Sequence, residues 1–318
     1  MQSQCILSIQ TPLGPPVEII RHTFCSSQSA KPAKRVSLVA GLHGDELEGL
    51  YICHRLMETL KILEEQNAFK GEVHIYPAVN PQALETGTRL WPFFSVDINR
   101  TFGETNAPSL VTEASRTLLE DLKSNSDLVV DFHASNLHLM ELPQIRIIKD
   151  FEKKLVPLAK LCNVDLVWVH PHAEIFESTL GYNLNRAKVP TLVIESGICL
   201  RIHKNYCEQI ILGILNLLRQ TGVIDSGEPL AEVTPPRLVQ PDYVAMIQAQ
   251  NAGLFVKQAE VGQMLKEGDK IGDLIGPDQV REEIRSPCFG LLFTLREHPL
   301  TGKGAPLARI ATEKPFKP

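Results

Sequence analysis

The sequence predicts an α/β fold, in which helices flank a largely parallel sheet, followed by a small all-β domain. Two patterns in the 318-residue chain carry this prediction. Through the first two thirds, short β-branched apolar runs alternate with longer segments of helical periodicity. After about Val223 the chain changes to short strand-like runs separated by glycines. We therefore place an α/β domain at residues 1–224 and a β-rich domain at residues 225–318.

The elements of the first domain are predicted from the spacing of apolar residues. Short runs of Val, Ile and Leu predict strands at 35–40, 72–77, 127–132, 164–169 and 191–194. Apolar residues that recur every three or four positions predict helices at 45–64, 108–123, 150–161 and 203–220. Strands that alternate with helices form crossover units and run parallel. Because ligands of such sheets bind beyond the carboxyl ends of the strands, the residues directly after each predicted strand are the first candidates for a site.

The C-terminal domain is predicted from its turns. Glycines at 253, 262, 268, 272 and 290 separate short apolar runs, and Pro and polar residues fill the segment that joins the two domains. Many short strands with regular turns make a sandwich or a barrel.

Composition argues against two broad classes of function. The net charge of -5 lacks the basic excess of a nucleic-acid-binding protein, and no apolar run approaches the ~20 residues that span a bilayer. The seven cysteines are scattered without a Cys-x-x-Cys pair, which is typical of free thiols in a reducing compartment. The first residues show no basic region followed by an apolar stretch. We therefore expect a cytoplasmic protein with no nucleic-acid or membrane partner.

The most specific local pattern is Gly41-Leu-His-Gly-Asp-Glu46 at a predicted strand-to-helix junction. His43 and Glu46 are two residues apart in this turn, so both side chains can point at one place. Imidazole nitrogen and carboxylate oxygen both bind zinc, and a catalytic zinc site has three protein ligands and one open position. The competing interpretation is a helix start whose acidic residues face the helix dipole.

Two other predicted strands end in polar residues of the same kind. His133 ends the run Leu128-Val-Val-Asp-Phe, and Glu195 follows Leu192-Val-Ile. Each one alone is compatible with a solvated strand end. Together with His43 and Glu46, however, they favour a metal site at one edge of the sheet.

Arginines supply groups that bind anions between these motifs. Arg89 and Arg100 lie in a segment without helical or strand periodicity, so we expect them in loops over the sheet edge. A guanidinium group is a planar fork that suits a carboxylate or a developing oxyanion. The alternative is two surface arginines paired with nearby acids.

Taken in order, these motifs resemble the succinylglutamate desuccinylase and aspartoacylase family, which is related to the zinc carboxypeptidases. The resemblance covers roughly residues 35 to 220. It rests on the motifs above and on three more: Asn-Pro at 80–81, Thr-Arg at 88–89 and Asp-x-Asn-Arg-x-Phe at 97–102. The resemblance implies a zinc-carboxypeptidase-like mixed sheet flanked by helices, and the β-rich tail is similar to the extra domain that many members carry.

The resemblance also implies roles for single residues. His43, Glu46 and His133 would bind one Zn²⁺ per chain, and Glu195 would be the general base. Arg89 would polarise the scissile carbonyl, and Asn99 and Arg100 would hold a substrate carboxylate. Asp97 is similar to an acid that orients the first metal histidine, which agrees with the usual second hydrogen bond of a zinc histidine.

Arg186 is a further candidate for substrate binding. Gly181-Tyr182 and Arg186 precede Glu195 at a spacing that resembles aspartoacylase, although the register differs by one residue. The same segment is compatible with a helix end before a strand.

We therefore predict a zinc-dependent amidohydrolase that removes the acyl group from a small N-acyl amino acid or a related carboxylate-bearing amide. Two alternatives stay open: a zinc carboxypeptidase that acts on peptides, and a non-catalytic binding protein on the same scaffold. The intact set of candidate residues argues against the binding protein. The expected partner is a small-molecule substrate, and the sequence leaves a homo-oligomer open.

Overall fold

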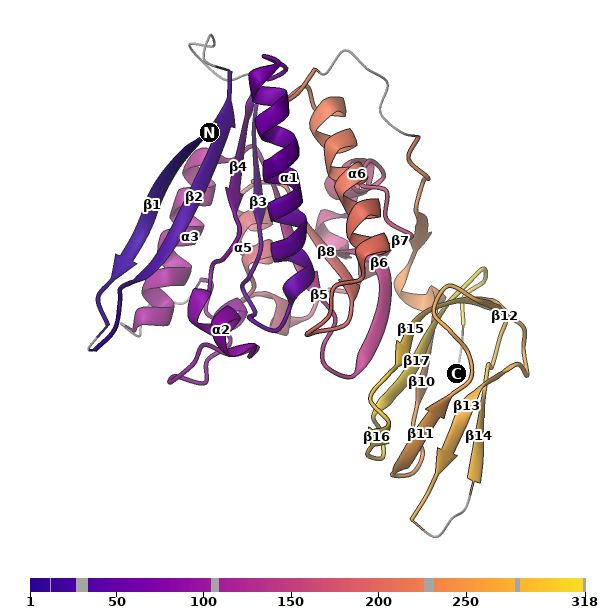
Figure 1. Cartoon of the computed structure of the whole chain (residues 1–318). Helices are drawn as coiled ribbons and strands as arrows, with labels where there is room; N and C mark the ends of the chain where they lie inside the picture. Colours follow the sequence, from indigo (N-terminus) through magenta and orange to yellow (C-terminus); the bar gives the residue numbers. More distant parts are fainter. Residues whose placement is uncertain (12, 27–33, 104–108, 226–231, 278–280, 317–318) are drawn as a thin grey trace.

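The computed structural model describes residues 1–318 except 12, 27–33, 104–108, 226–231, 278–280 and 317–318. Within the described residues, a 13-stranded mixed sheet runs through the whole molecule in the order β1-β2-β4-β3-β5-β8-β6-β15-β17-β10, with β7, β9 and β12 paired beside this path (Figure 1). Its strands are β1 (Gln2–Ile9), β2 (Val17–Cys25), β3 (Arg35–Val39), β4 (Glu72–Tyr76), β5 (Leu128–Ala134), β6 (Leu139–Ile148), β7 (Leu166–His170), β8 (Thr191–Gly197), β9 (Arg237–Val239), β10 (Val244–Gln248), β12 (Met264–Leu265), β15 (Gly290–Arg296) and β17 (Pro306–Thr312).

The centre of this sheet is parallel, as the alternating sequence pattern predicts. Strands β4, β3, β5 and β8 run parallel to one another, whereas β6 pairs antiparallel to β8. The carboxyl ends of β3, β5 and β8 therefore lie along one edge of the sheet. The predicted α/β fold with a mixed sheet is confirmed.

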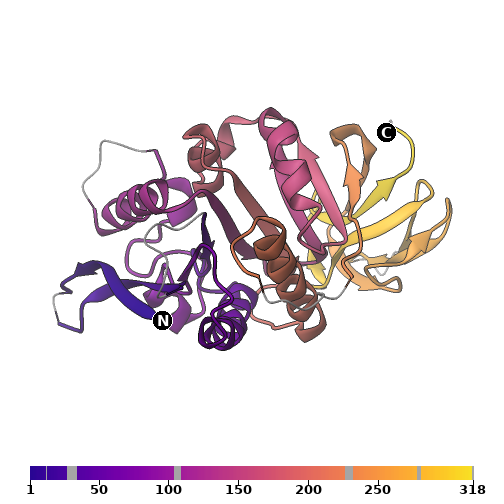
Figure 2. The ribbon, with the colours of Figure 1, turned by 90° about the horizontal axis from the view of Figure 1, so that it is seen from above.

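Helices cover both faces of the parallel strands (Figures 1 and 2). Apolar side chains of α1 (Leu47–Glu65) and α6 (Lys204–Gln220) pack in one core, and those of α3 (Leu110–Asn125) and α5 (Leu180–Arg186) pack in another. The short helix α4 (Glu152–Ala159) packs against β6, β7 and β8. Helix α2 (Pro81–Thr86) begins at the predicted Asn-Pro motif, where Asn80 caps it by accepting a hydrogen bond from the backbone of Ala83.

Each strand and helix predicted for the first domain is present, with ends shifted by a few residues. The first predicted residue of one helix, Pro108, lies outside the described residues. Strands β1, β2 and β6 were not predicted. β6 contains Pro143 and two charged residues, Glu141 and Arg146, which interrupt the apolar run that marks a buried strand.

The C-terminal region is all β, as its turns predict. A separate four-stranded sheet has the order β14-β13-β11-β16, with β11 (Gly253–Lys257), β13 (Lys270–Ile275), β14 (Arg281–Arg285) and β16 (Leu300–Thr301). Its apolar side chains share one core with those of β10, β15 and β17. We call the segment from β10 to β17, residues 244–312, the C-terminal β-module.

The C-terminal β-module is joined to the first part of the chain by backbone pairing. β15 pairs antiparallel with β6, so the large sheet continues from one part into the other. Upstream of the module, β9 pairs with β7 of the first part. The predicted boundary between residues 224 and 225 stays a prediction, because residues 226–231 lie outside the described residues. No helix among the described residues is long and apolar enough to cross a membrane.

Candidate metal centre and its cavity

His43 and Glu46 lie on the turn between β3 and α1. Glu46 stands at the N-terminal boundary of α1, and its carboxylate makes no capping hydrogen bond, so it is available to other partners. Gly44 allows this turn to lie against the backbone of α2, because a Cβ atom at that position would be 1.9 Å from the carbonyl carbon of Ala83. The glycine between the two candidate ligands is thus required by close backbone approach.

His133 and Glu195 lie near the carboxyl ends of neighbouring strands. β5 and β8 pair in parallel with His133 directly opposite Glu195, so both side chains leave the same face of the sheet. This face carries the core built by α3 and α5. The register of one strand pair therefore brings together two residues that are 62 positions apart in the sequence.

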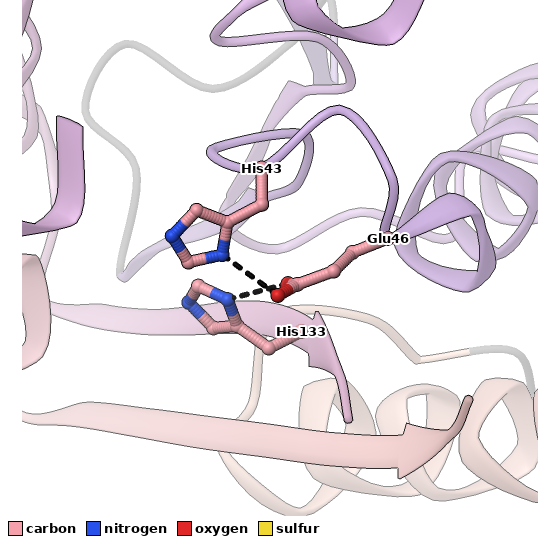
Figure 3. Close-up of side chains that lie close together, drawn as sticks. All are labelled: His43, Glu46 and His133. Carbon is pink, nitrogen blue, oxygen red and sulfur yellow. Dashed lines mark hydrogen bonds and ion pairs between the residues drawn. The ribbon is translucent and has the colours of Figure 1, made fainter. Parts of the chain in front are cut away.

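The two histidines converge on the carboxylate of Glu46 (Figure 3). The Nδ1 atom of His43 lies 2.7 Å from Oε1, and that of His133 lies 2.8 Å from Oε2. One ligand atom of each of the three residues lies within 4.8 Å of the others, and all three side chains are buried. These distances describe a compact set of two nitrogens and a carboxylate.

The outer nitrogen of each imidazole contacts a different carboxylate. Nε2 of His43 lies 2.9 Å from Asp97, and Nε2 of His133 lies 3.0 Å from Asp131. When each Nε2–H donates to its aspartate, the Nδ1 lone pair faces Glu46. Two imidazole lone pairs and a carboxylate that face one another are the electron-pair donors that divalent metal ions bind, so these residues fit a metal ion.

The same arrangement sets the charge of the centre. Burial alone would raise the pKa of Glu46, but the positive charge of the His43 and His133 rings in their protonated form holds that pKa well below its usual range. Burial would lower the pKa of His133, and the carboxylates of Asp131 and Glu46 raise it well above its usual value instead. Mutual stabilisation of this kind marks a site built to hold positive charge next to Glu46.

A second grouping of potential ligands shares Glu46 with Asp45 and Cys199. The Cys199 thiol donates a hydrogen bond of 2.7 Å to the backbone carbonyl of Ser135. Burial, together with the nearby carboxylates, raises the pKa of this thiol. A thiol that stays protonated is a poor metal ligand, so the His–Glu–His set is the better candidate.

Glu195 lies opposite His133 of the candidate metal centre and is held by an arginine. Its Oε1 atom lies 3.1 Å from Nη1 of Arg146, which comes from the neighbouring strand β6. Burial raises the pKa of Glu195, and the positive charge of Arg146 acts in the opposite direction. A half-buried carboxylate beside a candidate metal centre is suited to accept and return a proton.

The predicted loop residues are also close to the centre. Arg89 donates to Glu46 at 3.0 Å and to Asp97 at 3.2 Å, so its guanidinium group faces the candidate metal ligand Glu46. Arg100 ends the short 3-10 helix η1 (Ile98–Arg100), and Asn99 precedes it. The side-chain oxygen of Asn99 accepts from the backbone of Leu180, which leaves its NH₂ group to serve a ligand.

A cavity of about 440 Å³ opens onto the His–Glu–His set, whereas Asp97 behind His43 does not line it. Its polar lining includes His43, Glu46, His133, Arg89 and Glu195. Further lining comes from Asn99, Arg100, Arg146 and Arg309, and from the apolar and aromatic side chains of Ile148, Phe151, Leu155, Phe176, Tyr182 and Val193. The cavity thus combines a charged part with an apolar wall, as sites for small ligands do.

The structure brings together all of the predicted site residues except Arg186. Arg186 is exposed at the end of α5 and does not line the cavity, whereas Tyr182 and Asn185 of the same helix do. A substrate role for Arg186 stays a prediction. The structure places Arg186 at the end of α5, which is the alternative that the sequence left open for this segment.

Sequence reasoning missed four residues of the site. Asp131 could have been found, because residues two apart on a strand share a face and Asp131 precedes His133 by two. Glu141, Arg146 and Arg309 belong to no short motif. They reach the site through strand pairing over long sequence distances, which a single sequence does not reveal.

The fold and the site together define an α/β protein that carries a buried His–Glu–His centre, with a neighbouring glutamate, at the carboxyl edge of its sheet. A model of the succinylglutamate desuccinylase/aspartoacylase catalytic domain matches residues 32–221. The chain belongs to this family, as its motifs predicted.

Individual relatives agree with this assignment. The chain is 24% identical over 283 residues to the N-alpha-acetyl-L-2,4-diaminobutyric acid deacetylase of Halomonas elongata, covering 86% of this chain and 81% of that protein. The product-bound structure of the ectoine utilization protein EutE (DoeB) from Ruegeria pomeroyi has a TM-score of 0.78 at 19% identity, covering 94% of this chain and 90% of that one. A succinylglutamate desuccinylase/aspartoacylase structure from Rhodobacter sphaeroides has a TM-score of 0.76 at 21% identity, covering 96% and 91%. The two structures show that the fold is shared.

Proposed function

We propose that this chain is a zinc-dependent amidohydrolase that cleaves the amide bond of a small N-acyl amino acid or a related carboxylate-bearing substrate. One zinc ion would be held by His43, Glu46 and His133. The observation that carries the proposal is the convergence of both Nδ1 atoms on Glu46 while each Nε2 contacts its own aspartate. This arrangement supplies three protein ligands and leaves a side of the centre facing the cavity.

The relatives and the cavity support a small acylated substrate. The relative from Halomonas elongata is named as a deacetylase of an N-acetylated amino acid. A cavity of about 440 Å³ lies toward the small end of ligand pockets, which favours a compact molecule over an extended peptide. The free cysteines among the described residues agree with the cytoplasmic location that the sequence predicts.

In the proposed hydrolysis, the metal and the side chains around it would have different tasks. A bound zinc ion lowers the pKa of water from ~15.7 to about 7 and polarises a carbonyl oxygen. Glu195 takes a proton from the attacking water, and the oxygen of that water bonds to the amide carbon. The C–N bond then breaks and Glu195 returns the proton to the leaving nitrogen. The products are a carboxylic acid and an amine, and the acid then gives its proton to the amine or to water.

Two groups of side chains would hold the substrate. Arg89 points its guanidinium group at the centre and would donate to the carbonyl oxygen as negative charge develops there. Asn99 and Arg100 line the same cavity and would bind a substrate carboxylate. Arg186 is the weaker candidate for this role, because its side chain lies outside the cavity lining.

The test is a substrate screen with protein of known metal content. The protein is stripped with a chelator, reloaded with zinc and analysed for bound metal, and we expect one zinc per chain. Acetyl, formyl and succinyl derivatives of amino acids are then assayed beside short peptides by release of free amine. We expect turnover of an N-acyl amino acid that is lost on chelation and restored by zinc.

A matched variant separates chemistry from metal binding. Glu195→Gln keeps the shape of the side chain but cannot accept the proton, so zinc content should be unchanged while turnover falls by at least ~100-fold. Turnover of peptides alone would favour the carboxypeptidase, and a protein that refuses zinc would favour a binding protein. Normal activity of Glu195→Gln would remove this residue from the mechanism.

A further inference from the structure

A row of charged side chains crosses the large sheet from the C-terminal β-module to Glu195. Arg309 of β17 donates to Oε1 of Glu141 at 2.7 Å. Arg146 donates to Oε2 of Glu141 at 2.5 Å and lies 3.1 Å from Glu195. The row therefore reads Arg309, Glu141, Arg146, Glu195, with opposite charges in alternation.

Strand register places the inner half of this row. In the antiparallel pair of β6 and β8, Glu195 lies opposite Gln144 and Arg146 lies opposite Val193. Arg146 and Glu195 are therefore diagonal neighbours on one face of the sheet, a distance that a long side chain spans. The contact is a consequence of the strand pairing.

The outer half follows the same geometry across the join between the two parts of the chain. Glu141 of β6 lies opposite Thr294 of β15, and Thr294 lies opposite Arg309 of β17. The three residues form one line across three strands, and the hydroxyl of Thr294 reaches Glu141 at 3.4 Å. The same pairing of β6, β15 and β17 that joins the C-terminal β-module to the first part of the chain also places Arg309 beside Glu141.

Glu141 is the centre of the row and is completely enclosed. It is 1% exposed and accepts hydrogen bonds from Arg146, Arg309, Gln144 and Thr294. Trp168 lies beside both arginines, with its ring centroid 5.9 Å from the guanidinium carbon of Arg146 and 5.3 Å from that of Arg309. A buried carboxylate is stable only while such partners remain.

We propose that Arg146 is a positioning residue for Glu195, and that Arg309 of the C-terminal β-module keeps Arg146 in place by sharing the charge of Glu141. This inference rests on the proposed function of Glu195. The guanidinium group of Arg146 is a rigid fork with one nitrogen on each carboxylate. Without Arg309, the unpaired charge of Glu141 attracts both terminal nitrogens of Arg146. The carboxylate of Glu195 then loses its contact with Arg146.

A different role for the same arginines would be direct binding of an anionic substrate group, since both line the cavity. The two roles affect different kinetic constants. Loss of a substrate contact made equally in the ground state raises KM and leaves kcat unchanged. Misplacement of the general base lowers kcat and leaves KM nearly unchanged, because the base acts in the chemical step.

The test measures kcat, KM, zinc content and Tm on the best N-acyl amino acid of the substrate panel. We expect kcat to fall about 10- to 100-fold in Arg146→Met, and less in Arg146→Lys, which keeps the charge without the fork. In Arg309→Met we expect a smaller fall, with zinc content unchanged. Adding Glu141→Gln to Arg309→Met should recover most of the lost kcat, because the neutral amide no longer draws Arg146 away.

The matched control is Arg285→Met, which removes an exposed arginine and its surface ion pair from the same module. It should leave kcat, KM and Tm unchanged. Should Arg146→Met fail to fold, Arg146→Lys and the Arg309 and Glu141 variants still decide the matter. A rise in KM at constant kcat, or a kcat of Arg309→Met equal to that of the unsubstituted protein, overturns the proposal.

If the protein hydrolyses nothing on the panel, the proposed function has failed, and the positioning role is then tested without an activity assay. Crystal structures of the unsubstituted and the Arg309→Met protein then decide the inference. A Glu195 carboxylate that moves away from Arg146 in the variant supports the row as a positioning device. A Glu195 side chain that stays in place overturns it.

Discussion

At the scale of single residues, the outer hydrogen bonds of the histidines decide what the centre can bind. A neutral imidazole that donates through Nε2 presents a lone pair at Nδ1, and in this chain both Nδ1 atoms face Glu46. Asp131 is the aspartate that fixes His133, at 3.0 Å. We therefore expect Asp131 to orient a metal ligand and not to bind the metal itself.

Replacement of this aspartate tests that role. Asp131→Asn keeps the size of the side chain but removes the negative charge behind His133, so we expect zinc affinity to fall about 10- to 100-fold. Competition titration with a chromogenic chelator measures the affinity. Asp150→Asn is the control, because Asp150 makes a similar contact of 2.9 Å with His172 on the surface. Equal zinc affinity of Asp131→Asn and the unsubstituted protein would refute the assignment.

Arg89, like Glu195, is a residue whose loss should affect the chemical step without removing a proposed metal ligand. Its two terminal nitrogens contact Glu46 and Asp97. We expect Arg89→Ala to lower kcat by about 100- to 1000-fold, as the loss of an oxyanion donor does, and Arg89→Lys to lose less. Steady-state kinetics with the best panel substrate measures this. Arg55→Ala, an exposed arginine of α1, should have no effect, and a pure KM effect in Arg89→Ala would contradict the role.

At the scale of elements, the site depends on how closely the turn after β3 approaches α2. Gly44 lies against the backbone of α2, and its own backbone donates to the carbonyl of Thr88 at 3.0 Å. The turn that carries His43 and Glu46 is thus held by a neighbouring helix and by the loop that precedes Arg89. A substitution at Gly44 should therefore shift the proposed metal ligands His43 and Glu46.

We predict that Gly44→Ala weakens zinc binding although it removes no ligand. The added methyl group would meet backbone atoms of Ala83 and Leu84, at 1.9 to 2.4 Å, so the turn must shift. Overpacking of this kind destabilises a protein by about 1 to 3 kcal/mol. Zinc affinity and the free energy of unfolding are both measured. Gly302→Ala, where no atom lies within 4 Å of the added carbon, is the control, and identical behaviour of the two variants would contradict the prediction.

Elements also show where prediction from the sequence reached its limit. The parallel strands β3, β5 and β8 were predictable because each is a short apolar run, and their polar ends gave His133 and Glu195. β6 was not predictable, because Pro143 and two charged residues of the site, Glu141 and Arg146, interrupt its apolar pattern. The role of Arg309 could not be predicted for another reason. Its place beside Glu141 depends on the pairing of β6, β15 and β17, which a single sequence does not reveal.

At the scale of the whole molecule, one continuous sheet links the N-terminal hairpin, the metal centre and the C-terminal β-module. β1 and β2 extend the parallel strands on one side, and β15, β17 and β10 extend them on the other. His74 of β4, which does not line the cavity, lies in this sheet opposite Thr23 of β2. Its ring is 4% exposed, and its Nδ1 atom contacts the Thr23 hydroxyl at 2.9 Å.

His74 should make the unfolding free energy of the chain depend on pH. Burial, with the added effect of Arg21, lowers the pKa of His74 to about 4 although Glu72 lies 3.4 Å from Nε2. Above pH 6.5 neither the folded nor the unfolded chain protonates this ring. Between pH 6.5 and 4 only the unfolded chain binds the proton. The free energy of unfolding therefore decreases by about 3 kcal/mol as the pH is lowered from 6.5 to 4.

The neutral variant His74→Asn removes this contribution, because asparagine keeps a polar atom near Thr23 but does not titrate. We expect the variant to be less stable than the unsubstituted protein at pH 7, and the gap in unfolding free energy to narrow by about 3 kcal/mol as the pH falls to 4. Denaturant unfolding at several pH values, with a chelator present so that metal loss does not contribute, measures the gap. Parallel curves for the two proteins would mean that His74 is protonated in the folded sheet, and that the contact with Glu72 outweighs the burial of the ring.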